Sequence, residues 1–389
     1  MNADLRAWAE VNLDAIGNNI SQIKSRLSKG TMLMGVVKAN GYGHGACAVA
    51  EELIRGGADQ LAVAFADEAE ELRRNGFDVP ILILGKSSER DIERIVELDI
   101  MPAVSDIEFA QKLSDEAVAM GKSVRVHIKI DTGMSRIGFM AEEQDTIENI
   151  IKISQLPCVI IEGLFTHFAS ADEEDCRYTE LQFKRFMAVS AALEKAGVII
   201  PVKHVCNSAG LVRFPHMHLD MVRAGIILYG IYPSADFDKS LIDLMPAMTF
   251  CSRITHIKQV EEGVPLSYGR TYIAAKNSKI ATVSVGYADG YPRLLSGKAS
   301  VQVGENILPQ VGRICMDQCM IDASAVNNIN VGDRVVLFGG TTEGVSTENV
   351  ANLLGTIGYE LVCGVGRRVP RIYIRNGVRV GLKNYLFDT

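Results

Sequence analysis

The sequence predicts an α/β protein: an N-terminal (β/α)8 barrel of the TIM type over residues 1–244, then a mainly β C-terminal domain over residues 245–389. Three observations support this prediction. The chain has 389 residues, 48% apolar and 22% charged, which suits two domains with ordinary cores. Apolar strands alternate with amphipathic helices in the first part of the chain, as in a parallel barrel. After about residue 245, the chain consists mainly of short runs in which apolar and polar residues alternate, separated by clusters of turn-forming residues.

The barrel region begins with an amphipathic helix, a strand and a glycine-rich turn. Residues 12–27 place apolar side chains at steps of three and four, which predicts a helix with one buried face. The apolar run 32–37 predicts a buried strand that delivers Lys38 and then turns through residues 39–45, where glycines allow a tight turn and close approach to a ligand. A helix over residues 45–55 follows and stops at two glycines.

The same alternation continues through the predicted barrel. The further strands are expected at residues 61–64, 80–85, 101–105, 123–131, 158–167, 202–208 and 219–224. The helices between them are expected at residues 68–75, 88–98, 106–120, 144–154 and 178–196. With the strand before Lys38 this gives eight strands, which predicts a closed barrel. A doubly wound open sheet is the alternative that periodicity leaves open.

Several polar residues fall at the C-terminal ends of these predicted strands, where barrels carry their functional groups. They come from five different strands and are Lys38, Asp131, His167, the pair Asn207 and Ser208, and Arg223. Each has an ordinary structural alternative: solvent contact for the lysine, a helix N-cap for the Asn-Ser pair and an ion pair with Asp220 for the arginine. Their convergence on one end of a barrel favours a functional site.

The region after residue 245 changes character. Strands are expected at residues 254–260, 280–286, 299–303, 310–322, 334–338, 371–374 and 378–382, and one helix at 348–354. Turn clusters such as Gly304-Glu305-Asn306 separate them. This pattern is typical of a mainly β domain.

Composition and charge exclude several classes of protein. The net charge of −7 provides no basic surface for nucleic acid or an anionic membrane. The N-terminus has no apolar core like that of a secretion signal, and no apolar stretch approaches the roughly 18 residues of a membrane helix. The eight cysteines show neither disulfide density nor metal-ligand spacing, so we expect free thiols, no metal site and a cytoplasmic protein.

The stretch VVKANGYGHG, residues 36–45, resembles the pyridoxal-phosphate lysine motif of the bacterial alanine racemases. Further segments resemble that family in the same order: KIDTGMSRIG, MVRAGI, SYG, GYADGYPR and GRICMDQCM. The resemblance extends from AWAEVNLDAI near the start to RVPRIY near residue 373. It implies a pyridoxal 5'-phosphate enzyme, with the protein supplying the lysine, the phosphate site, the ring environment and the proton carriers.

The resemblance also assigns the cofactor site. Lys38 is the lysine that holds the cofactor, Arg223 lies at its ring nitrogen and His167 beside the ring. The phosphate is assigned to Ser208, with Asn207 in the same segment, and to Gly225, Ile226, Tyr42 and Tyr359. An arginine cannot usefully release a proton, so it weakens the electron sink and favours return of the proton to the substrate.

Two catalytic residues follow from the same resemblance, because racemisation requires a proton carrier on each face of a planar carbanion. Lys38 serves one face and Tyr268, in the SYG segment, serves the other. Tyr268 belongs to the β domain and Lys38 to the barrel, and in the family such residues meet across a homodimer. Taken alone, Tyr268 would be an ordinary strand-end aromatic residue.

The substrate residues are assigned with the same reasoning. In the family the lysine that matches Lys129 is carbamylated and orients the arginine that matches Arg136, which binds the substrate carboxylate with help from Met316. An ordinary ion pair between Lys129 and Asp131 is the alternative. Tyr287, Arg293 and Arg313 match residues that line the entrance. Glycines depart from the family pattern near the entrance tyrosine and could widen the pocket; they are Gly358, Gly364 and Gly366.

The preferred hypothesis is an alanine racemase that interconverts L-alanine and D-alanine by two-base proton transfer and supplies D-alanine for peptidoglycan. Racemisation of serine or a broader set of small amino acids is the second hypothesis. The third is a non-catalytic pyridoxal-phosphate carrier, against which a second base argues. A decarboxylase of the same two-domain layout is disfavoured further, because this chain lacks the cysteine-containing site segments expected of one.

Overall fold

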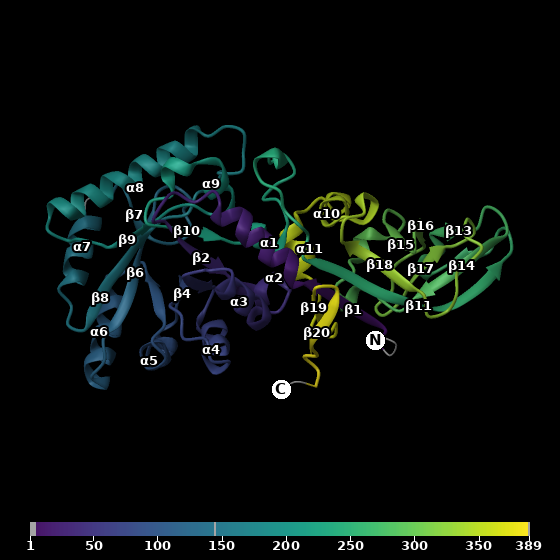
Figure 1. Cartoon of the computed structure of the whole chain (residues 1–389), viewed down its shortest axis with the longest axis horizontal. Helices are drawn as coiled ribbons and strands as arrows, with labels where there is room; N and C mark the ends of the chain where they lie inside the picture. Colours follow the sequence, from purple (N-terminus) through teal and green to yellow (C-terminus); the bar gives the residue numbers. More distant parts are fainter. Residues whose placement is uncertain (1–4, 144, 388–389) are drawn as a thin grey trace.

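The computed structural model describes residues 5–143 and 145–387 and shows an elongated molecule, with a barrel at one end and a β domain at the other (Figure 1). The barrel strands are β2 (Met32–Val36), β3 (Gln60–Val63), β4 (Ile81–Lys86), β5 (Met101–Val104), β6 (Val124–Asp131), β8 (Val159–Phe165), β9 (Val202–His204) and β10 (Met221–Ala224). They are parallel in the order β10-β2-β3-β4-β5-β6-β8-β9. Each overlaps a predicted strand, but β8 and β9 end at Phe165 and His204, before the predicted ends at residues 167 and 208.

The barrel closes between its last two strands. The backbone N–H of Asp220 donates to Lys203 O at 3.1 Å, and that of Arg223 donates to Cys206 O at 3.1 Å. At the other side, β10 pairs with β2 from Met221 opposite Met32 to Ala224 opposite Gly35. The predicted (β/α)8 barrel is therefore confirmed, and the open doubly wound sheet is excluded.

Helices cover the outside of the barrel. They are α1 (Leu13–Lys24), α3 (Ala46–Arg55), α4 (Ala66–Arg74), α5 (Ile92–Glu97), α6 (Ile107–Met120), α7 (Asp145–Ser154), α8 (Arg177–Lys195) and α9 (Ser208–Arg213). Side-chain caps fix the starts of two of them: Asn12 accepts from Ala15 N at α1, and Asp106 accepts from Phe109 N at α6. The predicted start of the α7 helix at Gln144 lies outside the described residues.

The second domain is built on a nine-stranded sheet in the order β14-β17-β16-β15-β18-β11-β1-β19-β20. Its strands are β11 (Met248–Val260), β14 (Ser278–Val283), β15 (Ser300–Val303), β16 (Asn306–Val311), β17 (Cys319–Asp322), β18 (Arg334–Gly339), β19 (Arg371–Arg375) and β20 (Val378–Lys383), with β1 (Ala7–Asn12) among them. The short strands β7 (Phe139–Met140), β12 (Pro265–Leu266) and β13 (Tyr272–Ile273) lie outside these main orders. The helices α10 (Thr347–Leu354) and α11 (Gly358–Cys363) pack near it. A mainly β second domain is confirmed.

Two features of this sheet differ from the prediction. The run 310–322 is not one strand but the end of β16 and all of β17, separated by a turn in which Gly312 has a φ of 68°. Strand β1, which the sequence reading did not find, pairs antiparallel with β11 and parallel with β19. Residues 7–12, assigned to the barrel region by the prediction, therefore lie in the second sheet.

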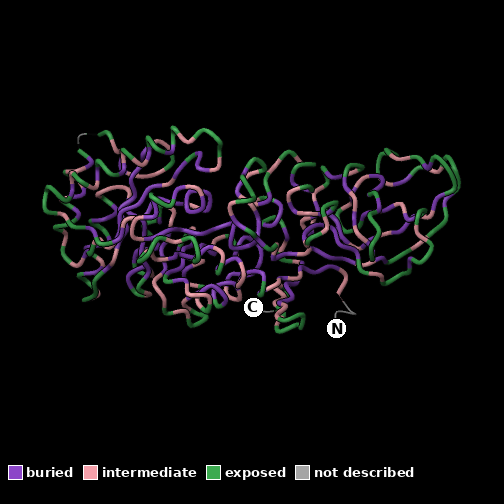
Figure 2. Tube along the Cα trace, turned by 45° about the horizontal axis from the view of Figure 1, so that its top comes forward, coloured by how far each residue is buried: buried purple, intermediate pink, exposed green. Residues whose placement is uncertain are grey.

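Buried residues run through both ends of the molecule and through the connection between them (Figure 2). The largest apolar cluster joins barrel residues such as Leu33 and Val104 to β-domain residues such as Val283 and Phe338. The two domains of one chain therefore share a continuous core. Among the described residues, no helix has the length and apolar character to span a membrane.

Candidate active site

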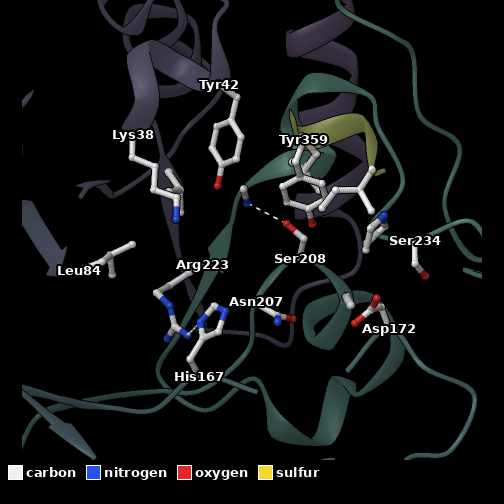
Figure 3. Close-up of a pocket in the computed structure, with 16 residues that line it drawn as sticks. Lys38, Tyr42, Leu84, His167, Asp172, Asn207, Ser208, Arg223, Ser234 and Tyr359 are labelled. Atoms are coloured by element: carbon white, nitrogen blue, oxygen red, sulfur yellow. Dashed lines mark hydrogen bonds between the residues drawn. The ribbon is translucent and has the colours of Figure 1, made fainter. Parts of the chain in front are cut away.

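A cavity of about 340 Å³ opens at the C-terminal ends of the barrel strands (Figure 3). Every residue that the sequence analysis assigned to a cofactor lines it: Lys38, Tyr42, His167, Asn207, Ser208, Arg223, Gly225, Ile226 and Tyr359. The first eight come from the barrel. Tyr359 comes from helix α11 of the C-terminal region, which lies over the mouth of the barrel in the same chain.

Lys38 follows strand β2, and the chain then makes one left-handed helical turn, labelled α2 (Lys38–Tyr42) in Figure 1. The φ angles are 53° at Ala39, 55° at Asn40, 59° at Gly41 and 50° at Tyr42. Left-handed residues other than glycine cost roughly 1–2 kcal/mol each, so surrounding contacts must hold this turn. The sequence predicted a glycine-assisted turn but not its hand.

The C-terminal region supplies part of that support. The side-chain oxygen of Asn40 accepts from Ala46 N at 3.0 Å, and its amide donates to the Tyr385 hydroxyl at 2.8 Å. The guanidinium of Arg371, which is buried, donates from Nε to Gly43 O at 2.8 Å. These contacts join the Lys38 turn to strand β19 and to the segment after β20.

Three groups form a cradle at one end of the cavity. The backbone N–H of Gly225 donates to Ser208 Oγ at 2.9 Å (Figure 3). A Cβ at Gly225 would lie 2.8 Å from the Tyr42 hydroxyl and 3.5 Å from Ser208 Oγ, so only glycine leaves this space open. Burial raises the pKa of Tyr42, which keeps its hydroxyl protonated and able to donate. Asn207 also accepts from Gly210 N at 2.9 Å, so it caps α9 while lining the cavity.

Arg223 is buried and hydrogen-bonded to backbone and imidazole groups. One Nη donates to His204 Nδ1 at 2.8 Å and to His204 O at 3.1 Å. The other donates to Thr166 O at 2.8 Å and lies 3.3 Å from His167 Nδ1. The alternative partner, Asp220, accepts instead from Lys203 N at 2.8 Å. Arg223 is thus aimed along the cavity wall beside His167.

The cavity is electropositive. Burial, together with the charge of Arg136, lowers the pKa of Lys38, and burial lowers the pKa of Arg223 to about 10. Burial and the charge of Arg223 hold the pKa of His167 and of His204 well below the ordinary value, so both imidazoles are neutral. A buried lysine with a lowered pKa has more of the free amine that reacts with a carbonyl. An anionic ligand would balance the remaining charge.

Lys129 is buried on β6 and does not line this cavity. Its Nζ donates to Ile130 O at 3.0 Å and lies 5.3 Å from the centre of the Phe165 ring. Burial and the charge of Arg223 lower its pKa to about 7. The carboxylate of Asp131, the alternative partner, instead accepts from the backbone N–H groups of Gly133, Ser135 and Arg136. Lys129 is therefore a buried amine without a close carboxylate in the described structure.

The remaining predicted residues form a second group on the β domain. Tyr268 lies in the turn η5 (Tyr268–Arg270), with its side chain 69% exposed. Ser267 Oγ donates to Arg313 O at 2.6 Å, which places Arg313 beside Tyr268. Met316 and Tyr287 are also exposed, and Ala288 N donates to Met316 O at 3.1 Å. Arg293 is exposed at the start of the nearby turn η7 (Arg293–Leu295).

None of these β-domain residues lines the cavity around Lys38. Figure 1 shows why: β13, which pairs with β12 on the other side of Tyr268, lies at the end of the β domain that points away from the barrel. Arg136 does not line the cavity either, but its charge lowers the pKa of Lys38 and so acts at the barrel mouth. Within one chain, the two predicted proton carriers, Lys38 and Tyr268, therefore lie apart.

Some cavity residues were missed by the sequence analysis: Val36, Leu84, Asp172, Ala209, Pro233, Ser234 and Ile357. Leu84 occupies a predicted strand end, so its position could have been found. Asp172 and Ser234 lie in loops, for which periodicity carries no signal. The glycines expected to widen the pocket do not line it; a Cβ at Gly358 would lie 2.8 Å from Ile231.

This arrangement defines a class of protein: a (β/α)8 barrel with a lysine of lowered pKa and a cradle of polar groups at the strand ends, joined to a β domain. The family model for the alanine racemase N-terminal domain matches residues 11–233, and that for the alanine racemase C-terminal domain matches residues 247–373. The chain belongs to the alanine racemase family, whose members are isomerases.

Curated relatives and solved structures agree with this assignment. An alanine racemase of Clostridium tetani is 47% identical over 97% of this chain and 98% of the relative. The structure of the Clostridium difficile 630 alanine racemase has a TM-score of 0.96 at 44% identity, covering 99% of this chain and 100% of that chain. A Bacillus anthracis alanine racemase with bound L-Ala-P has a TM-score of 0.93 at 39% identity, covering 98% of each chain.

Proposed function

We propose that this protein interconverts L-alanine and D-alanine with pyridoxal 5'-phosphate held at Lys38. The observation that carries the proposal is the convergence, in one cavity, of a buried amine with a lowered pKa, the Tyr42–Ser208–Gly225 cradle and the guanidinium of Arg223. The cofactor, when bound, supplies an electron sink for the Cα–H bond of the substrate. The relatives are alanine racemases, which supports alanine as the substrate.

The residues present fit this cofactor. Tyr42, Ser208, Gly225 and Ile226 would hold its phosphate, because the space between them is open only while residue 225 lacks a Cβ. Arg223 would meet the ring nitrogen as a hydrogen-bond donor that keeps its own proton. His167, Asn207 and Tyr359 also line the cavity; His167 would border the cofactor ring, and Tyr359 would join the groups that hold the phosphate.

Proton transfer is assigned to Lys38 on one face of the substrate and to Tyr268 on the other. Because Tyr268 is exposed on the β domain of its own chain, the second face must be served by another copy. We therefore propose a homodimer in which each barrel mouth is completed by the β domain of the partner. Arg136 and Met316 would then bind the substrate carboxylate, with Lys129 carbamylated to orient Arg136, and Tyr287, Arg293 and Arg313 would frame the entrance.

Subunit mixing tests the composite site directly. Dimers of Lys38→Ala and dimers of Tyr268→Ala are each expected to be inactive. A hybrid of the two carries both changes in one site and neither in the other, so mixing after mild dissociation should restore about a quarter of the wild-type activity. Continued inactivity of a hybrid population verified by native mass spectrometry would contradict the composite site.

The reaction itself is tested with L-alanine in deuterated water. NMR should show loss of the α-proton signal, and chiral chromatography of the same sample should show D-alanine. If protein loaded with pyridoxal phosphate shows neither loss of the α-proton signal nor D-alanine, the proposal is overturned. Parallel reactions with L-serine test the second hypothesis, racemisation of serine or of a broader set of small amino acids. The size of the cavity, about 340 Å³, does not decide between the two hypotheses. We place the enzyme in the cytoplasm, supplying D-alanine for peptidoglycan; the net charge of −7 favours neither membrane nor nucleic acid.

A further inference from the structure

His44 is a buried residue of the Lys38 motif to which the proposed reaction gives no role. Its exposed fraction is 0%. Its Nδ1 lies 2.9 Å from Tyr42 O and 3.1 Å from Gly41 O. Both oxygens are acceptors, so Nδ1 must carry the ring hydrogen and donate to them. Burial lowers the pKa of His44 to about 4, which keeps the ring neutral.

The other ring nitrogen of His44, Nε2, makes no hydrogen bond among the residues that the structure describes. It is an unprotonated acceptor, because the ring hydrogen is on Nδ1. A buried acceptor without a partner is unfavourable. The ring is therefore oriented for its Nδ1–H, whose two acceptors are carbonyls of the left-handed turn.

The same ring begins a stack that leads to the Tyr42 hydroxyl. His44 packs on Tyr229 with ring centres 4.6 Å apart, and Tyr229 packs on Tyr42 at 4.9 Å. The Tyr229 hydroxyl donates to Val36 O at 2.9 Å, on the strand that delivers Lys38. His44 thus contacts Tyr42 through its backbone carbonyl and, by way of Tyr229, through its ring.

We propose that His44 is a positioning residue whose Nδ1–H fixes the left-handed turn and thereby places the Tyr42 hydroxyl in the cradle with Ser208 and Gly225. The inference rests on the proposed function, because the cradle is taken to bind the cofactor phosphate. Its consequence is specific: loss of the Nδ1–H weakens binding of the phosphate group more than binding of the rest of the cofactor.

Two variants separate the hydrogen bond from the ring packing. His44→Phe keeps a ring against Tyr229 but removes the donor. His44→Asn removes the ring but retains an amide donor at the δ position. The measurement is the Kd of each folded protein for pyridoxal phosphate and for pyridoxal, which lacks the phosphate, followed by visible absorbance.

We expect His44→Phe to weaken pyridoxal phosphate binding about tenfold, while pyridoxal binding changes less than about threefold; tenfold corresponds to about 1.4 kcal/mol. His44→Asn should recover part of the loss. Equal weakening of both ligands, or no weakening of either, would overturn the role of His44. Failure of the unmodified protein to bind pyridoxal phosphate would instead overturn the proposed function itself.

A second measurement requires no variant. In protein labelled with ¹⁵N at histidine, the ring nitrogens of His44 should show the Nδ1–H tautomer, and this should persist from about pH 6 to 8 because the ring is neutral there. The Nε2–H tautomer, or a protonated ring in that range, would overturn the inference even if neither variant folds.

Discussion

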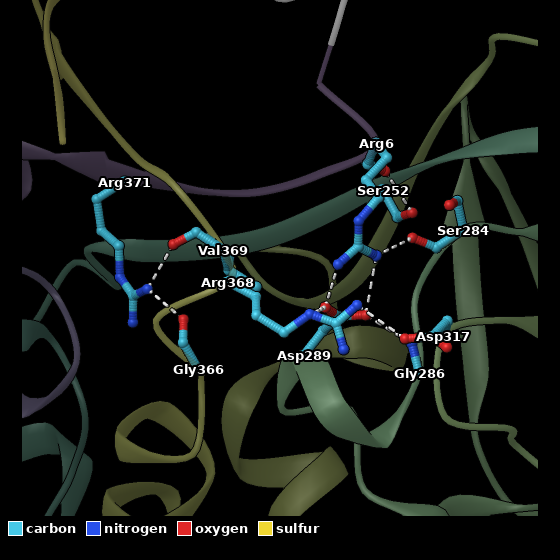
Figure 4. Close-up of polar contacts among 10 residues, drawn as sticks. All are labelled: Arg6, Ser252, Ser284, Gly286, Asp289, Asp317, Gly366, Arg368, Val369 and Arg371. Atoms are coloured by element: carbon cyan, nitrogen blue, oxygen red, sulfur yellow. Dashed lines mark hydrogen bonds and ion pairs between the residues drawn. The ribbon is translucent and has the colours of Figure 1, made fainter. Parts of the chain in front are cut away.

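Replacement of Asp289 tests how the β-domain face that carries Tyr287 and Met316 is held together. Asp289 is fully buried and lies at the end of the turn η6 (Tyr287–Asp289). One carboxylate oxygen accepts from Arg6 and lies 3.6 Å from Arg368 Nε (Figure 4). The other accepts from Arg6 Nη1 and from Gly286 N, each at 3.0 Å. The carboxylate thus joins the N-terminal segment to the turn.

The size of the effect follows from this geometry. Removing one partner of a buried ion pair costs about 3–5 kcal/mol, because the other charge is left uncompensated. Arg6 and Arg368 are 37% and 38% exposed, so water compensates them partly and the lower end applies. We expect Asp289→Asn to lower the free energy of unfolding by about 3 kcal/mol. Arg6→Met, which leaves Arg368 beside Asp289, should cost about 1–2 kcal/mol.

The assay is a double-mutant cycle in urea, with the melting temperature as a second readout; 3 kcal/mol corresponds to a fall of about 10 °C for a domain of this size. The double variant should lose about 1 kcal/mol less than the sum of the single losses. The exposed pair Asp175–Arg177 provides the control, and Arg177→Met should leave stability unchanged. Additive losses would show that Arg6 does not stabilise Asp289 and would refute the reasoning.

Three further predictions concern the proposed reaction. Lys38→Ala should abolish both the visible absorbance of lysine-bound cofactor and racemisation; retained turnover would contradict the central assignment. Tyr268→Phe should leave cofactor binding intact and slow α-proton exchange mainly from one enantiomer, as measured by NMR, whereas equal losses with cofactor release would make Tyr268 structural. Lys129 should take up ¹³C-labelled bicarbonate as a carbamate visible by NMR. Its pKa of about 7 means that the reactive neutral amine increases as pH rises through 7, so labelling that declines over this interval would contradict the assignment.

The barrel could be predicted because its signal is repeated. Each strand from β2 to β10 is an apolar run followed by an amphipathic helix, and the rule that functional groups lie at the strand ends then locates Lys38 and Arg223. Strand β1 has only six residues and does not belong to the repeated strand–helix pattern, so the sequence carried little signal for it. Its partners, residues 248–252 and 371–374, lie far along the chain, so pairing rather than local pattern determines its place.

The site was harder to predict where loops and distant segments form it. Asp172 and Ser234 line the cavity from connections whose conformation is set by tertiary contacts. The left-handed form of the Lys38 turn was not predictable from Ala39 and Asn40, since neither residue requires it. Resemblance supplied Tyr268 and its place on the β domain, and the structure adds that its side chain is exposed and does not line the cavity around Lys38.

The C-terminal segment connects the two halves of the proposed site within one chain. The N–H of Gly366 donates to Asp289 O at 3.0 Å, and Gly366 O accepts from Arg371 Nη1 at 2.7 Å (Figure 4). Arg371 also donates to Gly43 O in the Lys38 turn. Two residues, Gly366 and Arg371, connect Asp289 on the β-domain face to Gly43 in the strained turn, and the charged side chains of Asp289 and Arg371 are both buried. Gly366 lies in this bridge and does not line the cavity, and a Cβ there would come within 3.3 Å of Ala288 O, so the lack of a side chain at this position bears on how the two faces are positioned and not on cavity width.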